Sequence, residues 1–117
     1  MKKPLIFICS PYRGDVETNL ENARRYCRFA IRRGGRTSAP CIPFAPHLLF
    51  TQFLDDSVAH ERELGLELGL SMLSICDELW AFGVATAGMA LEISEAERLK
   101  IPVRYFNVFG GEVTCDE

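Results

Sequence analysis

The chain has 117 residues, of which 48% are hydrophobic and 25% charged, and its formal net charge is −3. These values are typical of one globular domain, covering residues 1–117, that can bury a core of its own. The weakly acidic charge argues against nucleic-acid binding, for which a basic face is expected, but one arginine and one helix end could still hold a phosphorylated small molecule.

The first third of the chain predicts a strand, a turn and a long helix. Leu5 to Cys9 form a continuous apolar run, which favours a buried strand over a leader peptide. Asp15 is a good cap for a helix that runs to about Arg33. We expect its inner face to carry the apolar residues spaced three and four apart, which are Leu20, Ala23, Cys27, Ala30 and Ile31.

The middle of the chain predicts a weak strand, a loop and a second helix. Residues 37–42 favour a short strand, and the prolines around His47 favour a loop, with a lid or surface loop at 51–57. A helix is predicted from Val58 to Ser74. Gly65 and Gly69 in that helix either allow a close approach or are simply tolerated, each at a cost of about 1 kcal/mol relative to alanine.

The last third predicts two strands around a third helix. The strands are expected at 78–82 and 102–106, the helix at 88–100 with Met89, Ile93, Ala96 and Leu99 inward, and one more short strand in the tail. Strands that alternate with helices predict an α/β fold, in which a mostly parallel sheet of four or five strands lies between two helical layers.

Five cysteines occur, and none of them forms a C-x-x-C pair. The odd number and the spacing fit no common zinc pattern, so we interpret the cysteines as reduced, mostly buried side chains of a cytoplasmic protein without metal or cofactor. The apolar runs are also shorter than the roughly 18 residues that would span a membrane.

Two turns carry the residues that could bind a ligand or take part in a reaction. Both follow a predicted strand and open a helix: Ser10-Pro-Tyr-Arg-Gly14 and the segment from Thr86 to Glu92. Ligands of parallel sheets bind beyond the carboxyl ends of the strands. Thr86 and Gly88 could place free N–H groups against an anion, or Thr86 could be an ordinary helix cap. Glu92 either complements the helix dipole or borders a crevice.

A recognisable pattern extends beyond these two turns. It includes Asn19, Ala23, Pro46-His47 and the segment Cys76-Asp-Glu-Leu-Trp-Ala-Phe-Gly83. Together they resemble the nucleoside 2-deoxyribosyltransferase-like superfamily, and within it a branch of small proteins common in bacteria and their phages. The resemblance implies a flavodoxin-like, Rossmann-like three-layer fold. It also implies cleavage or transfer at the N-glycosidic bond of a nucleoside or its 5′-monophosphate.

The resemblance also implies roles for individual residues. Glu92 falls at the position of a carboxylate nucleophile, and Tyr12 could orient it. The positions expected to contact substrate are Ser10, Pro11, Arg13, Gly14, His47, Thr86, Gly88 and Met89. His47 could equally be structural. The departing base needs a proton donor, for which the candidates are Glu63, Glu67, Asp55 and Asp56.

Two further expectations accompany this interpretation. The same pocket could hold a nucleotide without turnover, as in a binding or sequestering protein. Members of the superfamily commonly dimerise, so we expect a homodimer or higher homo-oligomer, with the aromatic segment 44–53 and the glycine-bearing helix as candidate interface. A purely structural partner protein is a third possibility for that apolar segment.

Overall fold

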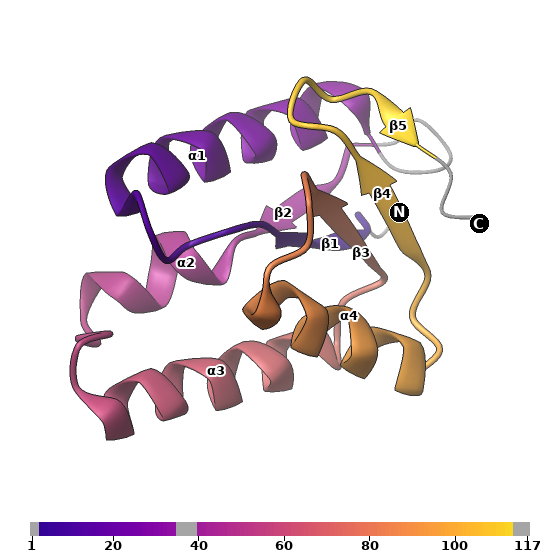
Figure 1. The fold of residues 1–117 in the computed structure, drawn as a ribbon. Helices are drawn as coiled ribbons and strands as arrows, with labels where there is room; N and C mark the ends of the chain where they lie inside the picture. Colours follow the sequence, from indigo (N-terminus) through magenta and orange to yellow (C-terminus); the bar gives the residue numbers. More distant parts are fainter. Residues whose placement is uncertain (1–2, 35–39, 114–117) are drawn as a thin grey trace.

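The structure, a computed structural model, describes residues 3–34 and 40–113. Strands and helices alternate along most of the chain (Figure 1). The elements are β1 (Leu5–Cys9), α1 (Val16–Arg33), β2 (Ile42–Phe44), α2 (Pro46–Leu49), the 3-10 helix η1 (Phe50–Gln52), α3 (Ala59–Leu73), β3 (Glu78–Phe82), α4 (Ala87–Arg98), β4 (Val103–Phe106) and β5 (Glu112–Val113). In this part of the chain, no helix combines the length and apolar character that crossing a bilayer requires.

The strands form one sheet in the order β2-β1-β3-β4-β5. β1 pairs in parallel with β2 and β3, β3 pairs in parallel with β4, and β5 joins the edge antiparallel to β4. α1 covers one face of the sheet, and α3 with α4 covers the other (Figure 1). This is the flavodoxin-like strand order, so the predicted fold class is confirmed.

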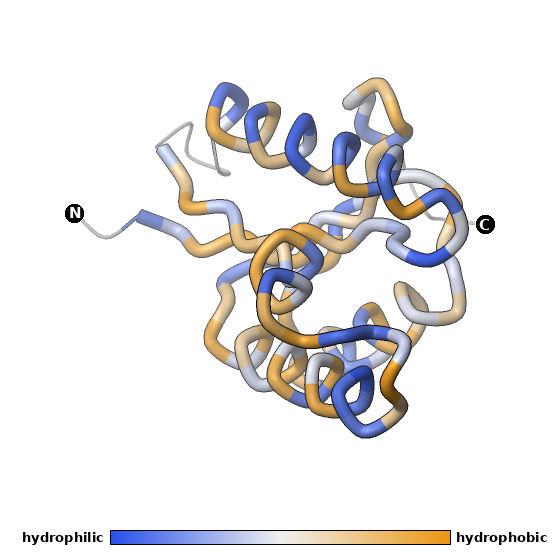
Figure 2. Tube along the Cα trace, turned by 90° about the vertical axis from the view of Figure 1, so that its left-hand side faces the viewer, coloured by the Kyte–Doolittle hydropathy of each residue, from blue (hydrophilic) through white to orange (hydrophobic). Residues whose placement is uncertain are grey.

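The core consists of two apolar layers, because alternate residues of a strand point to opposite faces of the sheet. Figure 2 shows the hydrophobic strands in the middle of the molecule. The layer beneath α1 contains Ile6, Ile8, Tyr26, Ala30, Trp80, Phe82 and Phe106. The layer beneath α3 and α4 contains Phe7, Cys9, Leu73, Leu79, Ala81, Met89 and Ala96. The central strands are therefore apolar on both faces, as their sequences predict.

The long first helix is confirmed, but its predicted inner face is wrong at one position. Asp15 caps α1 by accepting a hydrogen bond from the Thr18 N–H at 3.2 Å. Ile31 is 56% exposed, whereas Tyr26 is buried and stacks on Phe82 with ring centroids 4.2 Å apart. The buried face of a helix is only about 100° wide, so Tyr26 and Ile31 cannot both point into it. Tyr26 lies on the side that faces the sheet, and Ile31 lies outside it.

The middle of the chain differs most from its prediction. Strand β2 occupies 42–44 instead of 37–42, and residues 37–39 lie outside the described residues. Pro46 begins the short helix α2 instead of a loop, because a proline at the first helical position forfeits no helical hydrogen bond. In α3, a Cβ at Gly65 or Gly69 would lie 3.6 Å from Leu54 or 3.7 Å from Pro46. The glycines thus face the chain's own segment between Pro46 and Leu54.

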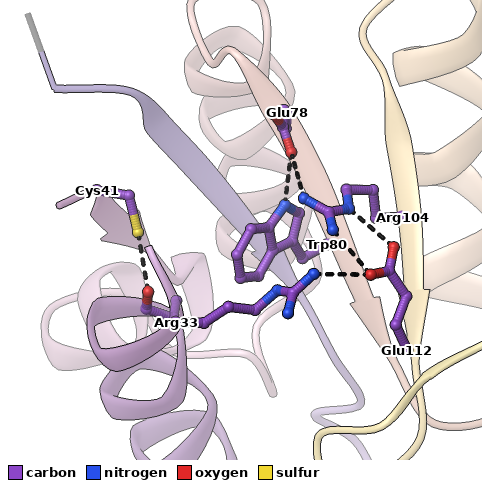
Figure 3. A network of polar contacts seen from close by, with 7 residues as sticks. Arg33, Cys41, Glu78, Trp80, Arg104 and Glu112 are labelled. Carbon is purple, nitrogen blue, oxygen red and sulfur yellow. Dashed lines mark hydrogen bonds and ion pairs between the residues drawn. The ribbon is translucent and has the colours of Figure 1, made fainter. Parts of the chain in front are cut away.

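A polar network closes the core at the end of α1 (Figure 3). The buried carboxylate of Glu78 accepts a hydrogen bond from the Trp80 indole at 2.8 Å, and Arg104 lies 3.7 Å from the same oxygen. Arg104 also makes two 2.8 Å hydrogen bonds to Glu112 in β5, to which Arg33 of α1 donates as well. Side chains from α1, β3, β4 and β5 are thereby tied together.

Replacing Arg104 with alanine is expected to destabilise the protein by about 2 kcal/mol, because it removes the compensation of a buried carboxylate. The matched control is Arg98→Ala, which breaks the exposed pair between Arg98 and Glu95 and should cost less than about 1 kcal/mol. Urea unfolding of both variants measures the two values. Equal costs would show that the network adds nothing beyond an exposed pair.

Candidate functional site

The first turn, Ser10 to Gly14, follows β1 and is held in a defined shape. Gly14 has a φ of +96°, in the region that favours glycine. The side-chain amide of Asn19, on the first turns of α1, donates hydrogen bonds to the carbonyls of Tyr12 and Arg13 at 2.9 and 3.0 Å. The helix therefore fixes the position of the turn that precedes it.

His47 supports the same turn from α2. Its Nε2 lies 3.0 Å from the Ser10 carbonyl, and its ring stacks on Tyr12 with centroids 5.0 Å apart and an interplanar angle of 27°. Burial lowers the pKa of His47, although the Ser10 carbonyl and Asp56 act in the opposite direction. The imidazole is thus neutral at pH 7 and donates from Nε2, and this geometry positions Tyr12.

A cleft of about 470 Å³ opens beside Tyr12. It is lined by Tyr12, Val16, Thr51, Leu54, Asp55, Asp56 and Ser57. Asp55 accepts hydrogen bonds from the Ser57 N–H at 2.9 Å and the Ser57 hydroxyl at 2.6 Å, which lowers its pKa. Asp56 lies 3.5 Å from Arg13 Nε, so an ion pair joins this segment to the first turn.

Glu92 is buried in α4, with 6% of its surface exposed. Burial raises its pKa from an ordinary 4.5 to about 7, and a hydrogen bond with the Cys9 thiol acts against that rise. Among the described residues, neither Oε1 of Glu92 nor the hydroxyl of the buried Ser10 has a hydrogen-bond partner. Buried polar atoms without a partner are costly, so they are the atoms most available to a ligand.

The start of α4 provides the remaining residues of the second turn. Thr86 caps the helix by accepting a hydrogen bond from the Met89 N–H at 3.2 Å, and both Thr86 and Gly88 are exposed. The Met89 side chain is packed in the core, and its carbonyl lies 3.8 Å from the Cys9 sulfur. The cap interpretation of Thr86 is confirmed, and the exposed helix end can still meet a ligand.

The topology brings three segments to the carboxyl edge of the sheet: the first turn, residues 51–57 and the beginning of α4. Of the four candidate proton donors, Asp55 and Asp56 line the cleft, whereas Glu63 and Glu67 are exposed on α3. The cleft also includes Val16, Thr51, Leu54 and Ser57, which are not among the residues predicted to form the site. The Asp-x-Ser spacing of residues 55–57, which is typical of a side-chain-stabilised turn, was the available signal.

Thiols and acids form no metal site in the part of the chain that the structure describes. No group of three or more histidine, cysteine, aspartate or glutamate side chains lies within reach of one ion there. Cys9, Cys27, Cys41 and Cys76 are free thiols, and Cys115 lies outside the described residues. Burial raises the pKa of all four, so their thiolates are scarce at neutral pH.

Comparison with known proteins gives a fold neighbour and a family. A solved 2-deoxyribosyltransferase from the psychrotolerant bacterium Bacillus psychrosaccharolyticus, described as a biocatalyst for nucleoside synthesis, is similar with a TM-score of 0.68 and 18% identity. The similarity covers 94% of this chain and 76% of that one, and at this identity it shows the shared fold. No curated protein matches the chain. Residues 4–106, which include both turns and the cleft, match one family, and the chain therefore belongs to the family described as a domain of unknown function (DUF7768).

Proposed function

We propose that the protein binds a nucleoside or its 5′-monophosphate at this sheet edge and cleaves or transfers at the N-glycosidic bond, with Glu92 as nucleophile. The observation that carries the proposal is the burial of Glu92, which leaves one carboxylate oxygen without a partner and raises the pKa to about 7. Strongly shifted carboxyl groups are concentrated at active sites. The fold shared with a 2-deoxyribosyltransferase gives this chemistry further support.

The proposed reaction has two steps. In the first, an oxygen of ionised Glu92 forms a bond to C1′ while the C1′–N bond breaks, and the bonding pair leaves with the base, which takes up a proton. In the second, water or the nitrogen of another base attacks C1′, releases Glu92 as carboxylate and gives up its own proton. Water yields the free sugar, and a second base yields a new nucleoside.

The other residues have supporting roles in this proposal. Tyr12, held by His47, forms a wall of the cleft, and the backbone of Ser10, Pro11 and Gly14 surrounds the sugar. At the start of α4, Thr86, Gly88 and the Met89 backbone present the helix end to the ligand. Asp55 and Asp56 are the cleft-side candidates for delivering the proton to the departing base; Asp55, whose pKa is lowered, would do so by relaying a proton from water, and single Asp→Asn variants separate the two.

Base release measured by chromatography tests the proposal. The protein is incubated with a panel of ribo- and deoxyribonucleosides and their 5′-monophosphates, with and without an acceptor base. Glu92→Gln keeps the shape of the side chain and should abolish release. Glu97→Gln is the matched control, because Glu97 is exposed at the far end of the same helix. No release with any substrate, or equal release by the Glu92→Gln variant, would overturn the proposal.

One observation favours a second candidate, binding without turnover. Tyr12, Asp55 and Asp56 line the cleft, but Glu92 is not among its lining residues. A ligand could therefore occupy the cleft without meeting the carboxylate. Thermal stabilisation by a nucleoside or nucleotide that is then recovered intact would support this sequestering role, whereas recovery of free base would contradict it.

A homo-oligomer is also part of the proposal. Leu49 and Phe53, in the aromatic segment 44–53, are 44% and 63% exposed, and Leu64 of α3 is 40% exposed. Large exposed apolar side chains on neighbouring elements are typical of a surface that another subunit covers. Light scattering at micromolar concentration measures the mass, and a monomer would remove this part of the proposal.

A further inference from the structure

The cleft beside Tyr12 carries acidic groups on the wall that a ligand's sugar or base would meet. Taking the proposed function as its basis, we infer that the site selects the unphosphorylated nucleoside, with a free 5′-hydroxyl, over the nucleoside 5′-monophosphate. The reason is the charge that the described residues place around the cleft. Residues 54–57 decide this selectivity more than the first turn does.

Among the described residues, those that line the cleft include two carboxylates and no lysine or arginine. Its residues are Tyr12, Val16, Thr51, Leu54, Asp55, Asp56 and Ser57. The Ser57 hydrogen bonds stabilise the charged form of Asp55. Asp55 and Asp56 also contribute to raising the pKa of the Tyr12 hydroxyl, after the larger effect of burial. Burial disfavours an ionised Tyr12 most, and the negative charges of Asp56 and Asp55 add to that effect; a phosphate in the cleft would meet the same two charges.

Arg13 is the nearest candidate to hold a phosphate, but it is already engaged. Its Nε lies 3.5 Å from Asp56, and its side chain is 66% exposed. A phosphate on Arg13 would have to displace the Asp56 carboxylate, leaving that negative charge beside the new ligand. The ion pair therefore removes much of the attraction that the arginine alone would supply.

The formal charges around the site also sum to a negative value. Asp55 and Asp56 of the cleft, together with the ionised form of Glu92 in α4, contribute three negative charges, against one positive charge on Arg13. Glu61, which accepts from the Asp55 N–H, and Arg62, which donates to the Asp56 carbonyl, add one charge of each sign and cancel. The amino end of α4 adds roughly half a positive charge. The resting site remains negative by about one and a half charges, and a phosphate dianion would add to this imbalance.

Hydrogen-bonding chemistry favours the same ligand. A carboxylate only accepts hydrogen bonds, and a sugar hydroxyl can donate one, whereas the oxygens of a phosphate dianion only accept. A free 5′-hydroxyl can thus bind directly to the Asp55 or Asp56 side of the cleft. The two carboxylates offer a phosphate no hydrogen bond, and the Thr51 and Ser57 hydroxyls of the cleft already donate to the His47 carbonyl and to Asp55, so the Tyr12 hydroxyl is the side-chain donor left to it among the described lining residues.

Matched substrate pairs test the inference. Deoxyadenosine is compared with its 5′-monophosphate, and deoxycytidine with its own. In each pair, kcat/KM should be at least roughly tenfold higher for the nucleoside, because a phosphate near one exposed carboxylate is repelled by about that factor. Asp55→Asn removes one charge and retains the oxygen that accepts from Ser57, so it should raise the relative kcat/KM of the monophosphate several-fold. Glu97→Gln removes a distant charge and should leave the ratio unchanged. Higher salt should narrow the ratio, because exposed charges are screened.

The outcomes separate this inference from the proposed function. Release that depends on Glu92 but is faster with the monophosphates overturns the inference and leaves the function standing. A selective loss of monophosphate turnover in Arg13→Gln would also overturn it, since Arg13 would then hold the phosphate. If no substrate is cleaved, the function fails, and thermal stabilisation by nucleoside but not by monophosphate still supports the inference. Equal stabilisation by both, or by neither, overturns it.

Discussion

Replacing Glu92 with glutamine is expected to stabilise the protein at pH 9 while removing its proposed activity. Burial raises the pKa of Glu92 from 4.5 to about 7, so the folded protein holds the proton more tightly than the unfolded chain does. The stability that Glu92 contributes is fully present below pH 4.5 and is lost as the pH rises through about 7. At pH 9 the buried carboxylate is ionised and costs about 3 kcal/mol, a cost that glutamine does not carry.

Differential scanning calorimetry at two pH values measures this effect. For a domain of this size, about 3 kcal/mol corresponds to a rise in Tm of roughly 10 °C at pH 9. At pH 4, where Glu92 is protonated in both states, the variant and the wild-type protein should unfold at similar temperatures. Glu97→Gln, an exposed change on the same helix, should shift Tm by little at either pH. A Glu92→Gln variant less stable than wild type at pH 9 would contradict the assigned burial.

The second large effect is expected in the pH dependence of the reaction. A nucleophilic carboxylate must be ionised, so kcat/KM should rise by about tenfold per pH unit below pH 7 and level off above it. Between pH 5 and pH 8 this amounts to roughly two orders of magnitude. A carboxylate with an ordinary pKa of 4.5 would give an almost flat profile over the same range. A flat profile would therefore exclude Glu92 as the group that controls the reaction.

Cys9 supplies the matched variant for the pH profile. Its thiol hydrogen-bonds to Glu92 and favours the ionised carboxylate. Cys9→Ala should therefore move the midpoint of kcat/KM to higher pH and leave the plateau in place. A lower plateau with an unchanged midpoint would instead indicate damage to the fold, because Cys9 is also a core residue.

At Glu92, stability of the fold and reactivity of the carboxylate are expected to oppose each other. A carboxylate that is buried and partly unpaired destabilises the fold at neutral and alkaline pH, and the same exclusion of water makes it reactive toward positive charge at C1′. Loss of stability at a functional residue is a recurring feature of enzymes. The opposite signs expected for stability and activity in Glu92→Gln are what distinguish a functional carboxylate from a structural one.

Much of the fold could be predicted because local signals and burial agreed. The apolar runs at Leu5–Cys9 and Glu78–Phe82 are the central strands, which are covered on both faces and so lack alternation. Asp15 and Thr86 begin their helices as their capping side chains predict. The prediction of secondary structure failed between residues 42 and 52, where the elements are short and the sequence is rich in proline. There β2, α2 and η1 are held in place by neighbouring elements more than by their own propensities.

The sequence by itself determined the strand-helix alternation, the two turns and the position of Glu92 one turn into the last helix. Only the tertiary structure decided that this carboxylate is buried and that Arg13 is paired with Asp56, far along the chain. It also placed residues 51–57 against the first turn, so that Asp55 and Asp56, not Glu63 or Glu67, line the cleft. Helix and strand patterns arise from neighbouring residues, whereas burial, pairing and charge at a site depend on segments that meet only when the sheet assembles.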